Sequence, residues 1–189
     1  MTPSRDDAYA LLREYNENES LVKHGLAVES TMKHFAQKFG EDEELWGIAG
    51  LLHDLDYGKY PEEHCHKSKE ILQDKGYSKV IIRAVMSHAY GICTDIEPIS
   101  LMEKTLYATD ELTGLVTACV YVRPSKSILD LTTKSVKKKY KQKSFAAGVD
   151  REVIQKGAKM LNMELSELIS EVIEGMKKDA KSLNLNGGL

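Results

Sequence analysis

Cysteine is scarce in this sequence, and its spacing excludes two kinds of small, cross-linked fold. The 189 residues contain three cysteines, Cys65, Cys93 and Cys119, which lie far apart and form no CxxC pair. An odd number of widely spaced cysteines suggests neither a disulfide framework nor a zinc ribbon. The sequence therefore predicts a protein of a reducing compartment, with the cytoplasm as its expected location.

Long apolar runs are also absent. The longest mostly apolar run covers residues 115–122 and includes Thr117, whereas a membrane-spanning helix needs about 20 apolar residues. The N-terminal stretch MTPSRDDAYALLREY lacks the apolar centre of a signal peptide. The formal net charge is −3, which gives no overall reason to expect nucleic acid. We therefore expect a soluble protein whose partners include neither a membrane nor a nucleic acid.

Proline is rare, and its positions favour an all-α fold. The four prolines, at 3, 61, 98 and 124, fall where helices begin or loops intervene, as expected for a residue that breaks helix interiors. No stretch shows a strand-like alternation of apolar and polar residues over a useful length. A chain of this length fits one domain, with a core over about 20–122 and a helical extension over about 123–183.

Capping residues and glycines divide the chain into helices. Ser4 is placed to cap the first helix, Gly40 to end the second, and Ser100 with Glu103 forms an S-x-x-E capping box. The tail over 184–189 is expected to fray. The predicted helices cover about 4–16, 20–39, 41–57, 62–75, 78–90, 100–122, 150–161 and 166–181, with Asp150 and Ser166 as caps of the last two.

Four polar residues stand where apolar side chains would be expected. His24, His53, Asp54 and Asp110 lie on or next to the apolar stripes of three predicted helices. One such histidine alone is more often a core residue bonded to backbone, and one such aspartate is more often paired with a lysine. Four together are better explained by a cation, since imidazole and carboxylate donors that converge on one point make an open metal site.

The order of these residues resembles the HD-domain superfamily of metal-dependent phosphohydrolases. The family pattern is a histidine, an adjacent His-Asp pair and a later aspartate. Here these are His24 in KHG, His53 and Asp54 in LLHDLD, and Asp110 in YATDELTG. The resemblance covers about 20–115 and implies an all-α helical bundle with these four residues as metal ligands.

Two further histidines resemble the second metal site of some members. The candidates are His64, in EEHCHKSKEIL, and His88, in MSHAYG. His66 competes with His64, because two residues two positions apart on a helix point in nearly opposite directions. We favour His64 from its spacing to Leu72, and we assign no role to His34.

The resemblance implies phosphate ester hydrolysis by metal-activated water, with one or two divalent ions per chain. A ligand set of histidines and carboxylates suits manganese, iron, cobalt, nickel or zinc. Asp54 and Lys59 are the expected catalytic residues, and Lys59 takes the place of a family lysine whose position holds Tyr57. The expected phosphate contacts are Lys59, Lys67, Arg123 and Lys126.

Two other classes of function stay open. A few relatives with this fold use two irons to cleave carbon bonds with dioxygen, and a catalytically silent metal-binding module is also compatible. The basic segment over 123–143, with eight basic residues against Asp130, is expected to pack near the pocket. We interpret its run over 134–143 as a solvated helix face. The alternative is a contact with an anionic ligand or with a second subunit of a homo-oligomer, and nucleic acid comes third because acids elsewhere offset the basic charge. The expected partner is a small phosphorylated substrate of unassigned identity.

Overall fold

The protein is all-α, as predicted. The computed structural model describes residues 3–187, which contain α-helices and one short 3₁₀ helix and no named strand. None of these helices is both long and apolar enough to cross a lipid bilayer. The helices are α1 (Arg5–Tyr15), α2 (Glu19–Phe39), α3 (Glu43–Leu51), η1 (Pro61–Glu63), α4 (His66–Asp74), α5 (Lys79–Ser87), α6 (Leu101–Tyr121), α7 (Thr133–Tyr140), α8 (Arg151–Met160) and α9 (Leu165–Lys178).

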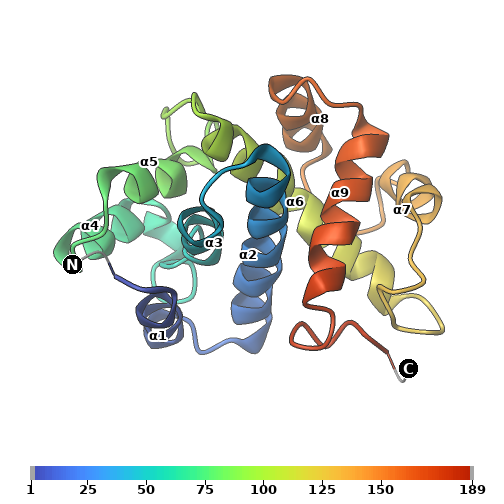
Figure 1. Ribbon diagram of the computed structural model, residues 1–189, viewed down its shortest axis with the longest axis horizontal. Helices are drawn as coiled ribbons and strands as arrows, with labels where there is room; N and C mark the ends of the chain where they lie inside the picture. Colours follow the sequence, from blue (N-terminus) through green and yellow to red (C-terminus); the bar gives the residue numbers. More distant parts are fainter. Residues whose placement is uncertain (1–2, 188–189) are drawn as a thin grey trace.

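Two long helices, α2 and α6, lie in the middle of the molecule. Figure 1 shows α1, α3, α4 and α5 on one side of α2, and α7, α8 and α9 on the other, with α6 running obliquely past α2. Each side has its own cluster of buried apolar side chains, and Leu26 and Leu45 pack against both clusters. The two sides therefore share a continuous apolar interior in which α2 and α6 face each other.

Most helix boundaries follow from local sequence signals. Ser4 forms a capping box with Asp7, and Ser100 forms the predicted box with Glu103. Gly40 ends α2 in the left-handed region, with φ of 74°, where glycine carries no steric penalty. Asp150 caps α8 as predicted, but the expectation that Ser166 caps α9 was wrong, because that helix begins at Leu165 without a side-chain cap.

Two predicted helices end or break well inside their expected bounds. The helix expected over 41–57 ends at Leu51, and the chain continues through a series of turns. The backbone N–H of Asp56 donates to the Ser68 hydroxyl at 3.2 Å. This N–H is therefore not free for the backbone hydrogen bond that a continuing helix would form. The helix expected over 62–75 is interrupted at Cys65, which has a φ of 67° and separates η1 from α4.

The chain after α9 is packed against the rest of the protein. Leu185 is 2% exposed, and its carbonyl accepts a hydrogen bond from the backbone N–H of Ile128 at 2.7 Å. The expectation of a frayed tail was therefore wrong for 184–187, because apolar burial fixes this segment. The remainder of that expectation, 188–189, lies outside the described residues.

Candidate metal centre

Four of the six expected ligands meet between α2, α3 and α6. His24 lies on α2 and Asp110 on α6, and His53 and Asp54 lie in the turn that follows α3. His24 Nε2 lies 2.8 Å from Asp110 Oδ1 and 3.2 Å from His53 Nε2. His53 Nε2 is 3.3 Å from both Asp54 Oδ2 and Asp110 Oδ1. We call these four residues the first cluster.

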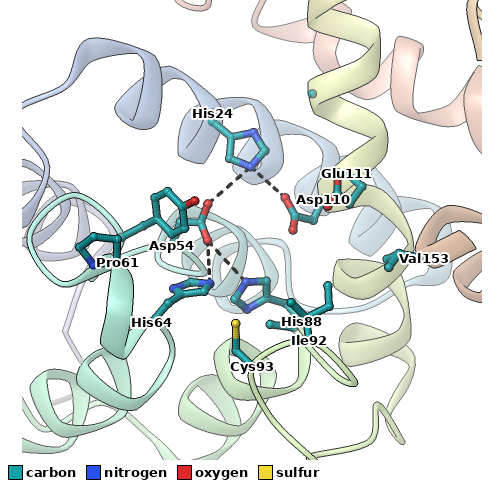
Figure 2. Close-up of a pocket in the computed structure, with 13 residues that line it drawn as sticks. His24, Asp54, Pro61, His64, His88, Ile92, Cys93, Asp110, Glu111 and Val153 are labelled. Carbon is teal, nitrogen blue, oxygen red and sulfur yellow. Dashed lines mark hydrogen bonds and ion pairs between the residues drawn. The ribbon is translucent and has the colours of Figure 1, made fainter. Parts of the chain in front are cut away.

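The other two expected ligands lie on the opposite side of Asp54. His64 Nε2 and His88 Nε2 are each 3.4 Å from Asp54 Oδ1, and we call these two histidines the second cluster. Figure 2 shows the Asp54 carboxylate between His24 above and the His64 and His88 rings below. Each oxygen of Asp54 therefore faces a different set of histidines.

Backbone and carboxylate acceptors fix the orientation of three of these rings. His53 Nδ1 is 2.7 Å from the carbonyl of Gly50, and His88 Nδ1 is 2.5 Å from that of Val85. Because a carbonyl can only accept, Nδ1 of both rings carries the proton in this assignment. When such a ring is neutral, its Nε2 has a lone pair that faces the site, as a metal ligand requires.

His64 is held in the same way by a buried carboxylate that sequence reasoning missed. Its Nδ1 is 2.7 Å from Asp56 Oδ1. The other oxygen of Asp56 accepts from the Ser68 backbone N–H at 2.8 Å, and Asp56 is fully buried. A carboxylate behind a ligand histidine fixes its orientation and raises its basicity. The available signal was the second aspartate of the D-x-D sequence at the end of a buried segment.

The donor set of these clusters fits a transition metal. Ligand atoms about 2.1 Å from a metal and at adjacent positions are about 3.0–3.4 Å apart, which matches most of the separations in the first cluster. Without a cation, neutral rings would place lone pairs against carboxylate oxygens. Burial opposes the protonated ring of His53, but Asp54 and Asp110 outweigh burial and raise its pKa well above the ordinary value. The site therefore attracts positive charge, which a divalent ion supplies more fully than one proton.

The same balance governs the two carboxylates. Burial alone would raise the pKa of Asp54 and of Asp110, but the neighbouring histidines outweigh it and lower the pKa of each carboxyl. Both groups are therefore held in the ionised form in which they bind metals.

The clusters open into a pocket of about 410 Å³. Glu111, beside Asp110, is the other acid in its lining, and burial and the charge of Asp110 raise the pKa of Glu111 to about 7. Its Oε2 accepts from the backbone N–H of Asp150 at 3.1 Å, which ties α6 to the start of α8. The lining residues are His24, Asp54, Tyr57, Pro61, His64, His88, Ala89, Ile92, Cys93, Asp110, Glu111, Gly114 and Val153.

The structure does not bring the expected phosphate-binding cations to this pocket. Lys59 Nζ lies 5.0 Å above the Tyr15 ring, and Lys67 Nζ is 2.8 Å from Glu70. Arg123 pairs with Asp130 at 2.7 Å. Neither these three residues nor Lys126 line the pocket, and nor does any other residue of 123–143. The prediction that this segment packs near the pocket has no support from the lining, which includes Val153 of α8.

The two histidines left out of the clusters have other environments. His66 is the exposed first residue of α4, and the unusual backbone of Cys65 separates it from His64. His34 Nε2 is 2.6 Å from Glu171, so it joins α2 to α9. His64 and not His66 is therefore the histidine that faces Asp54.

Comparison with protein families agrees with this geometry. The family model described as HD domain matches residues 21–115, a segment that contains both clusters and about half of the chain. The protein belongs to the HD-domain family. No solved structure matches the chain. The fold is therefore of a metal-dependent hydrolase type, and residues of the described chain could hold the metal.

Proposed function

We propose that the protein is a metal-dependent phosphohydrolase that acts on a nucleotide or another small phosphate ester. The observation that carries this proposal is the Asp54 carboxylate, whose two oxygens face separate histidine clusters at 3.3 Å (His53) and 3.4 Å (His64 and His88). One carboxylate shared in this way supports two ions held close together. When bound, paired divalent ions lower the pKa of water and bind phosphoryl oxygens during displacement.

The chain's own residues prepare this site. Gly50 and Val85 fix the rings of His53 and His88 through their carbonyls, and Asp56 fixes His64. Because these three rings are oriented before substrate arrives, little side-chain conformational entropy is lost when substrate binds. The 410 Å³ pocket has room for a small ester. Asp54 remains the proposed catalytic residue, whereas the proposed role of Lys59 has no support from its position over Tyr15.

The test is phosphate release by metal-reconstituted protein. Apo protein is loaded separately with manganese, iron, cobalt, nickel or zinc, and each form is assayed against nucleotides, cyclic nucleotides and simple phosphate monoesters. We expect turnover with at least one metal and its loss in Asp54→Asn. Asp74→Asn, an exposed aspartate at the end of α4, is the matched control and should behave like the unsubstituted protein.

Two outcomes would contradict the proposal. Iron-dependent consumption of dioxygen without phosphate release would assign the site to oxygenase chemistry. Two ions bound per chain with no turnover of any ester or oxygen would indicate a metal-binding module without catalysis.

A further inference from the structure

A second, smaller cavity adjoins the metal pocket. Its volume is about 160 Å³, and His24 and Gly114 line both it and the metal pocket. We call it the side cavity. It lies between α2 and α6, and its lining residues are Ser20, Lys23, His24, Ala27, Gly114, Thr117, Tyr121, Leu183 and Leu185. A group bound at the metal pocket therefore has a neighbouring space beyond His24.

Gly114 has no packing reason to be glycine. A Cβ at Gly114 would meet only Val149 Cγ2, at 3.9 Å, which is ordinary contact. By contrast, a Cβ at Gly25 would lie 2.9 Å from the carbonyl oxygen of Leu51. Gly114 lies inside α6, where glycine is less favourable than alanine. Gly114 lines both cavities and adds no side chain between them.

Lys23 is the basic residue in the lining of the side cavity. Of the lysines and arginines that the structure describes, Lys23 alone lines either the metal pocket or the side cavity. It is partly buried, and within residues 3–187 it forms no ion pair with a carboxylate. Its position directly before His24 on α2 places its backbone beside the first cluster. This lysine is therefore available to an anionic ligand.

The C-terminal extension closes the far side of this space. Leu183 and Leu185 follow α9 and are buried against the cavity. The backbone bond from Ile128 to the Leu185 carbonyl holds the segment in place. Thr117 and Tyr121 continue the same face of α6 beyond Asp110 and Gly114. The extension thus forms part of the wall of the side cavity, which its sequence did not indicate.

We infer that the substrate is a short phosphate ester with a second anionic group, which passes Gly114 and contacts Lys23 in the side cavity. This inference rests on the proposed function for the place of the first phosphate. A volume of about 160 Å³ corresponds to roughly five water molecules, enough for a carboxylate or phosphate with a few carbons. The ligand chemistry is a second anion, and the test distinguishes carboxylate from phosphate.

The first test measures binding of phosphonates, which cannot be hydrolysed at the carbon–phosphorus bond. Metal-loaded protein is titrated calorimetrically with 3-phosphonopropionate, with 1,3-propanediphosphonate and with propylphosphonate, which lacks the second anion. We expect one of the two compounds with a second anionic group to bind about tenfold more tightly than propylphosphonate. The expected gain is modest because a partly exposed charge pair lies at the low end of the range for hydrogen bonds to charged groups. Whichever compound binds more tightly identifies the second group.

Substitutions separate the charge from the space. Lys23→Met should remove the preference for the second anion while leaving metal content and propylphosphonate affinity unchanged. Lys69→Met, an exposed lysine on α4, is the matched control. Gly114→Leu should weaken all three three-carbon phosphonates about tenfold without changing methylphosphonate binding. Gly148→Leu, at an exposed glycine with nothing within 4 Å of its Cβ position, controls for the added side chain.

The outcomes distinguish this inference from the proposed function. A tenfold preference that disappears in Lys23→Met supports the inference even if no ester is hydrolysed, in which case the proposed reaction alone is wrong. Equal affinities of all three phosphonates, a preference that survives Lys23→Met, or no measurable binding would overturn the inference. The inference would then be wrong even if the protein hydrolyses simple phosphate monoesters.

Discussion

Replacing Asp56 by asparagine should empty the second cluster of metal while leaving the first cluster loaded. Asp56 accepts two hydrogen bonds, from His64 Nδ1 at 2.7 Å and from the Ser68 backbone at 2.8 Å. Asparagine has one oxygen and one NH₂ group in place of the two oxygens, so it can accept only one of these bonds. The change keeps the size of the side chain and removes its charge.

Both orientations of the new amide are unfavourable. If its oxygen faces His64, the NH₂ group opposes the Ser68 N–H, and an unsatisfied buried donor costs about 1–3 kcal/mol. If its NH₂ group faces His64, the ring must carry its proton on Nε2, the atom that faces Asp54. The second orientation removes the ligand atom itself. Loss of such a supporting partner typically lowers metal affinity by about 10–100-fold, or about 1.4–2.7 kcal/mol.

The assay is metal titration of apo protein by calorimetry, with metal analysis after dialysis against a weak chelator. We expect the unsubstituted protein to bind two ions per chain and Asp56→Asn to retain close to one. Asp74→Asn should match the unsubstituted protein. Equal weakening of both ions, or no change in either, would refute the assignment of Asp56 to His64, and a single ion in the unsubstituted protein would refute the second cluster.

Three further experiments test other parts of the structure. His64→Ala should lose more metal than His66→Ala on metal analysis, and the reverse would reassign the ligand. Neutralising Arg123 and Lys126 together should leave KM for a phosphorylated substrate unchanged, because neither residue lines the pocket, and a raised KM would show that the segment reaches the substrate. Gly157→Ala should lower the free energy of unfolding in denaturant titration by about 1–3 kcal/mol, since a Cβ there would overlap the backbone of α6; unchanged stability would contradict that close packing.

The ligand residues could be predicted because they violate local expectations. A histidine or aspartate among apolar neighbours needs a partner, and His24, His53, Asp54 and Asp110 each stand out in this way. The resemblance to a known ordered pattern then supplied His64 and His88. The structure places the four histidines within 3.8 Å of the two oxygens of Asp54, and it places Asp110 against His24 and His53.

The turn between α3 and α4 could not be predicted in the same way. Its apolar residues continue the helical pattern of α3, so periodicity extended the helix to Asp54 and beyond. The competing contacts are tertiary, from Ser68 to Asp56 and from Asn16 to Gly58, whose N–H lies 3.0 Å from the Asn16 side-chain oxygen. Neither contact can be predicted from the local sequence.

The sequence did not predict where the basic side chains lie, because charge composition does not specify the direction in which a side chain points. Arg123 and Lys126 follow the helix that carries Asp110, but Asp130 pairs with Arg123 and holds it away from the site. Lys23, by contrast, directly precedes His24, and the packing of α2 against α6 makes it part of a cavity lining. Whether a basic side chain can bind an anionic ligand therefore depends on the carboxylates that lie near it in the fold.

A buried ion pair between α1 and α2 makes stability depend on pH. Glu29 is 5% exposed and accepts hydrogen bonds from Arg5 at 2.9 Å and from Lys33 at 2.5 Å. Burial alone would raise the pKa of Glu29, but Arg5 and Lys33 outweigh it and lower the pKa below its ordinary value. A carboxyl whose pKa is lower in the folded state stabilises the fold above its unfolded pKa, about 4.3, and this contribution is lost as pH falls through the folded pKa.

At pH 7, Glu29→Gln should therefore lower the free energy of unfolding by about 1.5–3 kcal/mol, the range for hydrogen bonds to charged groups. The difference from the unsubstituted protein should shrink below about pH 4, whereas Glu17→Gln, at an exposed position, should show little difference at any pH. Urea titrations between pH 2.5 and 8 measure both curves, and a difference that stays constant across this range would mean that packing, and not the charge of Glu29, accounts for the loss.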